Sequence, residues 1–291
     1  MPTADANGIS LHYDTFGDPA DPTMVLVSGL GTQMIMWLEE FCESLVDRCF
    51  HVVRFDNRDS GLSTRFDEPV DLMAVQQAVA SGESPPVPYR LADMASDVVG
   101  LLDALGIDSA HVVGASLGGM VAQRVAIDHP TRVRSLTSMM STTGAPDVGQ
   151  PSREALVALL EPTPLGREAV IAAGLACRRI WGSPDHLDED ALRAYFARCY
   201  DRAPDGDGAN RQFAAVLVDG SRDAELATVR CPALVVHGDH DVLIHPSGGE
   251  RTAAVLPDAE LLMLEGLGHD LPSPYWQQVI ESLTRLAIRT L

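Results

Sequence analysis

The sequence contains no lysine, so all 21 of its basic residues other than histidine are arginine. Against them stand 41 acidic residues, which give a formal net charge of −20 at pH 7. A surface with this balance repels phosphate backbones and anionic lipid headgroups, so electrostatic attraction cannot drive binding to nucleic acids or membranes. The sequence therefore predicts neither a nucleic-acid partner nor a membrane partner.

Cysteines are few, and long apolar runs are absent. The five cysteines are widely spaced and form no Cys-x-x-Cys pair, which is typical of buried thiols rather than of disulfides or zinc ligands: Cys42, Cys49, Cys177, Cys199 and Cys231. No stretch reaches the roughly 18 to 20 consecutive apolar residues that a membrane span requires. The N-terminus has no basic segment followed by an apolar run. These absences predict a soluble, cytoplasmic protein without a metal.

Short β-branched runs alternate with longer helical patterns in the first half of the chain, which is typical of an α/β protein with a parallel sheet. Six buried strands are predicted, at residues 24–27, 51–55, 111–113, 133–139, 233–236 and 261–264. Residues 91–105 carry apolar side chains on one helical face and are followed by Gly106, so they predict an amphipathic helix that packs on the sheet. Residues 9–13, followed by Gly17 and Asp18-Pro19, indicate an antiparallel edge hairpin.

Residues 145–228 have a different pattern. They contain many prolines and glycines, no convincing strand, and four helix-like segments at 153–160, 167–180, 188–200 and 210–218. We predict that they form a helical cap over the carboxyl edge of the sheet, where ligands of α/β proteins bind. The core domain then consists of residues 1–144 and 229–291. A proline-rich loop is predicted at 81–88.

The strongest local signal is Gly114-Ala115-Ser116-Leu117-Gly118-Gly119, between the predicted strand at 111–113 and a helical pattern at 120–127. It matches the Gly-x-Ser-x-Gly nucleophile elbow, a strained strand-to-helix turn that exposes the serine hydroxyl above the sheet. Glycines flank the serine because the strand and the helix approach too closely for a β-carbon. A plain glycine-rich turn is the alternative, whereas a dinucleotide-binding loop is excluded because the Gly-x-Gly-x-x-Gly spacing is missing.

A serine hydroxyl is a poor nucleophile at neutral pH, so it needs a neighbouring base and a group that orients this base. His269 is predicted to be the base, because it ends the glycine-rich segment Gly266-Leu267-Gly268-His269 after the last predicted strand. The alternative histidines have positions more typical of packing or surface residues: His12, His51, His111, His129 and His186.

The orienting acid is predicted to be Asp241. Along a chain with this elbow, the acid follows a strand that lies between the serine and the histidine. Asp241 meets this condition because it comes soon after the predicted strand at 233–236. Asp239, two residues earlier, is the competing candidate. His237, His240 and Asp241 also permit a metal-ligand interpretation, but no other histidine or cysteine cluster completes such a site.

Two backbone N–H groups are expected to stabilise the oxyanion that forms on the substrate. One belongs to Leu117, which follows the nucleophile at a helix N-terminus. The other is assigned to Leu30 in the loop Ser28-Gly29-Leu30-Gly31, for which a plain strand-ending turn is the alternative. Contacts with an apolar substrate are predicted for three residues on or after this loop: Gly29, Met34 and Trp37. Ordinary core packing is the alternative for these apolar side chains.

With these motifs in this order, the chain resembles the α/β-hydrolase superfamily over essentially its full length. The segment at 56–63, Asp-Asn-Arg-Asp-Ser-Gly-Leu-Ser, is similar to the D-x-R-G-x-G-x-S turn of this superfamily, with Asp59 where glycine is usual. Together with Phe-Gly-Asp-Pro-Ala near the N-terminus and Gly-His-Asp-Leu-Pro-Ser-Pro near the C-terminus, this variant is most similar to the branch of aclacinomycin methylesterase and related bacterial carboxylesterases. The resemblance implies an α/β-hydrolase fold, with a mostly parallel central sheet flanked by helices and a helical cap insertion.

Two positions refine the resemblance. Ser28 stands where a histidine often precedes the glycine of the oxyanion loop; this residue usually supports the loop, so the difference leaves the class unchanged. Ser116 stands where haloalkane dehalogenases and epoxide hydrolases of this fold have aspartate, which argues against both of these classes.

The sequence thus predicts a serine carboxylic-ester hydrolase that acts through an acyl-enzyme and requires no cofactor. Its expected partner is a small-molecule apolar ester, such as a methyl ester of a polyketide-like molecule. Cofactor-free perhydrolysis, thioester hydrolysis and C–C bond hydrolysis use the same triad and are the alternative reactions. A small-molecule receptor built on a hydrolase scaffold is the non-enzymatic alternative.

Overall fold

The sheet is mixed but mostly parallel. The computed structural model describes residues 2–204 and 206–290, so residues 1, 205 and 291, which the predicted core and cap ranges include, lie outside the described residues. In the described part of the chain, eight strands form one sheet in the order β1-β2-β4-β3-β5-β6-β7-β8. Their bounds are β1 Thr3–Ala6, β2 Ile9–Phe16, β3 Thr23–Val27, β4 His51–Phe55, β5 Ala110–Ala115, β6 Val133–Met139, β7 Ala233–Gly238 and β8 Ala259–Leu264. Strands β3 to β8 pair in parallel, whereas β2 pairs antiparallel with both β1 and β4.

All six predicted strands are present as β3 to β8, and β4 and β6 have the predicted bounds. The prediction of burial is wrong for β8, which is an edge strand with Glu260 and Leu261 exposed. An antiparallel hairpin that contains residues 9–13 lies at the edge of the sheet, as predicted, but its turn is not the predicted one. Residues 9–13 belong to β2, but the partner in the hairpin is the preceding β1, which forms the edge of the sheet. The turn is Asn7-Gly8, where φ is +49° and +78°. An Asn-Gly pair with positive φ at both residues is the turn that a two-residue hairpin favours, and this signal outweighs Gly17 and Asp18-Pro19.

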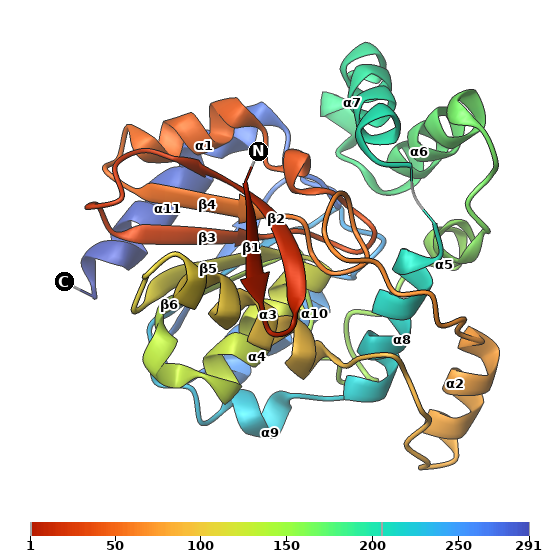
Figure 1. The fold of residues 1–291 in the computed structure, drawn as a ribbon, viewed down its shortest axis with the longest axis horizontal. Coiled ribbons are helices and arrows are strands. Elements are labelled where there is room, and N and C mark those ends of the chain that lie inside the picture. The colour runs from red at the N-terminus through yellow and green to blue at the C-terminus, as the bar shows by residue number, and fades with distance from the viewer. Residues whose placement is uncertain (1, 205, 291) are drawn as a thin grey trace.

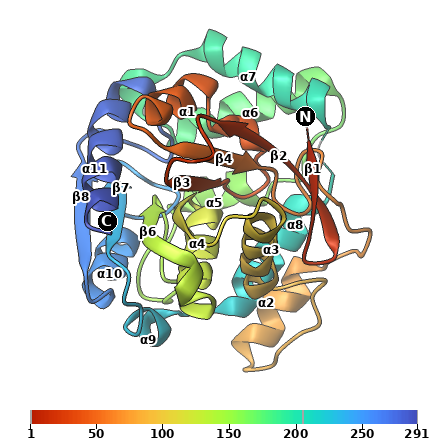
Figure 2. The same cartoon turned by 60° about the vertical axis from the view of Figure 1, so that its left-hand side comes forward.

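Two layers of helices cover the sheet. Helices α3, α4 and α10 pack on one face, and α1 and α11 pack on the other (Figure 1; Figure 2). The helices span α1 Glu39–Val46, α2 Leu72–Ala80, α3 Leu91–Ala104, α4 Leu117–Asp128, α5 Arg153–Leu160, α6 Arg167–Trp181, α7 Glu189–Arg202, α8 Gly208–Asp219, α9 Asp223–Leu226, α10 Ser247–Val255 and α11 Trp276–Ile288. Helix α3 is the predicted amphipathic helix, and the apolar side chains of its inner face are buried. The sheet and these two layers form the core of the molecule.

Between β6 and β7 the described residues form helices α5 to α9 and no strand. We call this segment the helical insertion. Helices α5 to α8 lie together to one side of the sheet in Figure 1, where α8 also packs against α2. Helix α2 was not predicted. It begins after Asp71, whose carboxylate accepts hydrogen bonds from the backbone N–H groups of Met73 and Ala74. The predicted proline-rich loop at 81–88 contains no helix or strand.

The structure bears on two expectations from composition, namely the lack of a membrane-spanning helix and the burial of the cysteine thiols. Among the described helices, none has both the length and the apolar character needed to cross a bilayer. Cys42 is buried, as predicted, and burial raises the pKa of its thiol to about 12. The prediction of a buried thiol is wrong for Cys49, which is exposed because it lies in the turn between α1 and β4, with φ at +62°.

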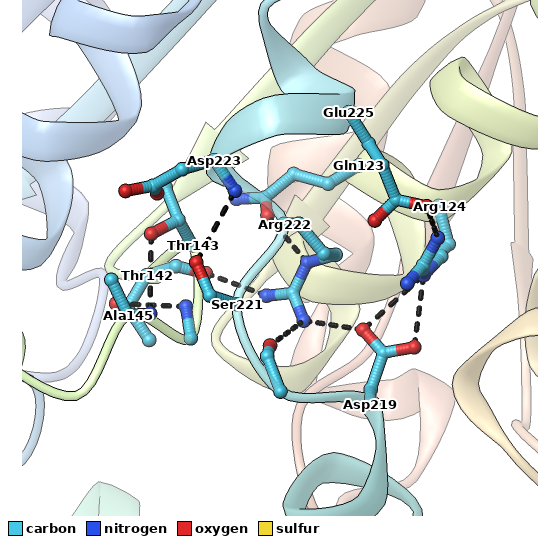
Figure 3. A network of polar contacts seen from close by, with 12 residues as sticks. Gln123, Arg124, Thr142, Thr143, Ala145, Asp219, Ser221, Arg222, Asp223 and Glu225 are labelled. Atoms are coloured by element: carbon cyan, nitrogen blue, oxygen red, sulfur yellow. Dashed lines mark hydrogen bonds and ion pairs between the residues drawn. The ribbon is translucent and has the colours of Figure 1, made fainter.

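A buried polar network joins the end of the helical insertion to the core (Figure 3). The side chain of Arg222 is fully buried, and burial lowers the pKa of its guanidinium despite the nearby carboxylate of Asp219. Arg222 donates to the side chain of Gln123 on α4 at 3.0 Å, to Asp219 at 2.6 Å and to the carbonyl of Thr142 at 2.8 Å. Gln123 in turn donates to the hydroxyl of Ser138 on β6 at 3.0 Å. The network therefore links the segment after α8 with α4 and β6.

Replacing Arg222 with methionine is expected to lower the free energy of unfolding by about 3 kcal/mol, because it leaves buried acceptors on Gln123 and Thr142 without their donor. Urea denaturation followed by circular dichroism measures the change. Arg285→Met is the matched control, since Arg285 forms a pair with Glu260 in which both side chains are more than half exposed, and it should change stability by less than about 0.5 kcal/mol. Equal effects of the two substitutions would contradict a stabilising role of the network.

Candidate active site

The sequence-predicted residues follow four different strands. Ser116 comes directly after β5, Asp241 after β7, His269 after β8 and Leu30 after β3. These strands are parallel, so their carboxyl ends meet at one edge of the sheet. At this edge lies a cavity of about 1690 Å³, whose walls include four of the residues predicted for the triad and the oxyanion hole: Leu30, Ser116, Leu117 and His269.

The cavity lies between the core and the helical insertion. The walls on the core side include Trp37, Met120 and Trp276. The walls on the insertion side include Leu156 of α5, Tyr195 of α7 and Phe213 of α8. Most of these groups are apolar or aromatic, so the cavity suits a ligand that buries apolar surface.

The segment around Ser116 has the geometry of a nucleophile elbow. Ser116 joins β5 to α4 with φ at +57° and ψ at −119°, a conformation that costs energy in a residue with a β-carbon. A β-carbon at Gly114 would overlap the carbonyl of Gly118, and one at Gly118 would overlap the carbonyl of Val27. The glycines therefore permit the close approach of β5, α4 and β3 that holds the serine in this conformation.

Two backbone N–H groups beside the serine are without partners. Leu117 is the first residue of α4, and Leu30 lies in the loop after β3. Within residues 2–204 and 206–290, neither backbone N–H donates a hydrogen bond. Gly29, in the same loop, lies against Ser116, since a β-carbon on Gly29 would be 3.5 Å from that of the serine. Unpaired N–H groups next to a hydroxyl at a helix N-terminus suit an oxygen that carries negative charge.

Asp241 and His269 form a buried pair. Nδ1 of His269 lies 2.7 Å from Oδ2 of Asp241, while Oδ1 of Asp241 accepts hydrogen bonds from the backbone of Leu243 and Ile244, each at 2.9 Å. Burial acts to raise the pKa of Asp241, but His269 and a hydrogen bond from His237 outweigh it and hold this pKa well below its ordinary value. Because an ionised carboxylate only accepts hydrogen bonds, His269 donates its Nδ1–H to Asp241. In the neutral imidazole with this tautomer, Nε2 is an acceptor.

The competing acid and the metal-ligand alternative have other contacts. Asp239 is partly exposed and accepts hydrogen bonds from Nδ1 of His240 at 2.7 Å and from the backbone of Gly266 at 2.8 Å. Nε2 of His237 donates to the carbonyl of Ile244 at 2.8 Å and also lies 3.4 Å from Oδ2 of Asp241. In the described part of the chain, no group of three or more histidine, cysteine and acidic side chains has the arrangement of a metal site.

The alternative histidines lie apart from Ser116 or make other contacts. His12, His51 and His111 are buried in β2, β4 and β5, and burial lowers the pKa of all three, that of His111 to about 4. None of these three lines the cavity. His129 ends α4, at the opposite end of that helix from Ser116. His186 does lie in the cavity wall, within the helical insertion.

The segment after α6 holds the loop that carries His269. The backbone N–H of His269 donates to the carbonyl of Trp181. The hydroxyl of Ser183 accepts a hydrogen bond from the backbone of Gly268 at 2.9 Å and donates to the carboxylate of Asp270 at 2.5 Å. Sequence reasoning missed Trp181 and Ser183, because nothing in the local sequence marks a contact with a loop more than 80 residues away.

The predicted substrate contacts divide into two groups. Gly29 and Trp37 line the cavity. Met34 does not: its side chain is fully buried, and its backbone N–H donates to Asp56 at 2.7 Å. The neighbouring Met36 lines the cavity instead, because residues 34–36 form a 3₁₀ turn that points their side chains in different directions. The substrate contact predicted for Met34 therefore has no support in this structure.

Fold and site together define an α/β hydrolase. The family model described as alpha/beta hydrolase fold matches residues 22–272, and the chain belongs to this family of hydrolases. The family membership and the fold class predicted from the sequence are confirmed.

Individual relatives cover nearly the whole chain. A rhodomycin D methylesterase from Streptomyces peucetius is 28% identical over 284 residues, which are 91% of this chain and 90% of that protein. The 3-oxoadipate enol-lactonase 2 from Acinetobacter baylyi is 25% identical and covers 90% of this chain and 88% of its own. The crystal structure of an enol-lactonase from Burkholderia xenovorans has a TM-score of 0.71 and 25% identity, with 99% of each chain covered.

Proposed function

We propose that this protein is a serine carboxylic-ester hydrolase in which Ser116 is the nucleophile, His269 the base and Asp241 the orienting acid. The observation that carries the proposal is the buried pair of Asp241 and His269, at 2.7 Å. The histidine of this pair lines the same cavity as Ser116, which has strained backbone at the start of α4. The unpaired N–H groups of Leu30 and Leu117 are assigned to the oxyanion hole.

The proposed reaction has two steps. Oγ of Ser116 attacks the ester carbonyl and forms a C–O bond, while its proton passes to Nε2 of His269. The tetrahedral intermediate places its negative oxygen on the N–H groups of Leu30 and Leu117. As the bond to the alcohol breaks, the leaving oxygen takes the proton from His269. A water molecule, deprotonated by His269, then attacks the acyl-enzyme, the carboxylic acid leaves, and the proton returns to Ser116.

The proposed substrate is a large, mostly apolar carboxylic ester. Drug-sized ligands occupy cavities of about 300 to 1,000 Å³, whereas this cavity measures about 1690 Å³ and has apolar walls. It therefore suits a molecule with several rings. The 28% identity to a rhodomycin D methylesterase supports a methyl ester as the bond that is cleaved. We propose that residues 145–228 form a cap that closes the cavity over residues 1–144 and 229–291.

Labelling with a fluorophosphonate probe tests the proposal. The probe should modify one residue, Ser116, as read by mass spectrometry of proteolytic peptides, and it should abolish turnover of p-nitrophenyl esters and of polycyclic methyl esters in the same proportion. Ester turnover without labelling of Ser116 would contradict the assignment. Peroxide-dependent halogenation or acyl-CoA hydrolysis faster than ester hydrolysis would instead favour a perhydrolase or a thioesterase with the same triad.

A further inference from the structure

We infer that Gln212 on α8 is a positioning residue for the oxyanion loop, defined as residues 28–33. This inference rests on the proposed function, because it concerns the loop to which one oxyanion donor is assigned. Gln212 belongs to the helical insertion, 181 residues away from the loop along the chain, and its side chain is fully buried. It lies in no motif of the sequence.

The side-chain amide of Gln212 joins the oxyanion loop to the turn at residues 56–63. Its Oε1 accepts a hydrogen bond from the backbone N–H of Gly31 at 2.8 Å. Its Nε2 donates to the carbonyl of Arg58 at 2.7 Å and to the hydroxyl of Ser60 at 3.0 Å. Three hydrogen bonds from one buried amide leave it a single orientation, so the oxygen faces Gly31.

The hydrogen bond from Gly31 to Gln212 fixes a backbone segment in a conformation that glycine adopts readily and other residues rarely do. Its φ is +62°, and the residue lies so close to α8 that a β-carbon would be 3.1 Å from that of Ala209. The N–H of Gly31 belongs to the peptide between Leu30 and Gly31, and the N–H of Leu30 belongs to the peptide immediately before it. Fixing the backbone at Gly31 therefore restricts the direction in which the N–H of Leu30 points. An oxyanion donor is effective only when it is already oriented before charge develops on the substrate.

Asp59 explains why α8 lies where Gln212 can make these contacts. Both oxygens of its carboxylate accept hydrogen bonds from the guanidinium of Arg211, each at 2.9 Å, and both side chains are nearly fully buried. Tyr89 donates to the same carboxylate at 2.5 Å. With φ at +66°, position 59 has a backbone conformation that favours glycine. Aspartate here adds a buried anchor for the residue next to Gln212.

The test compares Gln212→Met, Gln212→Glu and the control Gln123→Met. Gln123 is also a fully buried glutamine with a hydrogen-bonded amide, but it contacts Arg222 and Ser138 rather than the oxyanion loop. The readouts for each variant are kcat and KM with a p-nitrophenyl ester, inhibition by phenylboronic acid, thermal unfolding, and hydrogen exchange of the peptide that contains residues 28–33.

For Gln212→Met we expect kcat to fall about 10- to 100-fold with KM changed by less than about 3-fold, because the loss concerns the transition state and not substrate binding. The inhibition constant of phenylboronic acid should rise by a similar factor, and hydrogen exchange of the loop should be faster. Gln212→Glu keeps an acceptor for Gly31 and should restore part of kcat. Gln123→Met should lower the unfolding temperature yet leave kcat within about 3-fold.

Unchanged kcat, inhibition and loop exchange in Gln212→Met would overturn the inference, as would an equal loss of kcat in Gln123→Met at equal loss of stability. Failure of the proposed function has a different result, namely no Ser116-dependent turnover in the unsubstituted protein. In that case loop exchange alone decides whether Gln212 positions residues 28–33.

Discussion

Ser116→Ala is expected to lower kcat for ester hydrolysis by about 10⁵- to 10⁶-fold, because no other group can form the acyl-enzyme. The remaining rate enhancement comes from binding and from the oxyanion donors, which do not depend on the hydroxyl. The backbone at position 116 has φ at +57°, and alanine and serine both carry a β-carbon there. The substitution therefore leaves the strain of the elbow nearly unchanged and isolates the chemistry of the hydroxyl.

The measurement is initial-rate kinetics on p-nitrophenyl acetate, with thermal unfolding to show that the variant is folded. Ser96→Ala is the control. Ser96 lies on α3, and its hydroxyl donates only to the carbonyl of Ala92. It should retain activity within about 2-fold, as expected for a half-buried serine on a helix that contributes no residue to the cavity wall. Activity in Ser116→Ala above about 1% of the original would show that the nucleophile is another residue.

The central fold is readable from the sequence because its determinants are local. Buried parallel strands are continuous apolar runs, and β4 and β6 have the bounds that these runs predict. The apolar periodicity of α3 and the glycines at 114 and 118 likewise act within their own segment. Helix α2 was missed because it is short and follows charged and proline residues, and its packing partner, α8, lies more than 120 residues later.

The candidate site can be predicted only in part, because some of its residues lie in local motifs and others are placed by long-range contacts. Ser116, Asp241 and His269 each occur in a local motif after a strand, so sequence alone brings them to one edge of the sheet. The residues that support their loops have no such motif. Ser183 and Gln212 contact these loops only because the helical insertion folds back over the core. Amphipathic periodicity predicts that a helix exists, but not which loop its polar side chain reaches.

Asp241→Asn is expected to lower kcat at neutral pH by about 10⁴-fold, because it changes which ring nitrogen of His269 carries the proton. In the native site, Oδ1 of Asp241 accepts hydrogen bonds from the backbone N–H groups of Leu243 and Ile244, both at 2.9 Å. These donors hold the oxygen of an asparagine amide in the same place. Its NH₂ group then occupies the position of Oδ2, 2.7 Å from Nδ1 of His269, and donates to it. The imidazole proton moves to Nε2, which can no longer accept the proton of Ser116.

Asp239→Asn is the matched control, since it makes the same chemical change two residues away. The carboxylate of Asp239 contacts His240 and the backbone of Gly266, and it is partly exposed. Its loss should change kcat by less than about 3-fold. The profile of kcat/KM against pH separates the two variants further. Hydroxide can replace the base only in Asp241→Asn, so its activity should recover as pH rises, while Asp239→Asn keeps the original profile. An equal loss in both would mean that neither acid orients His269 alone.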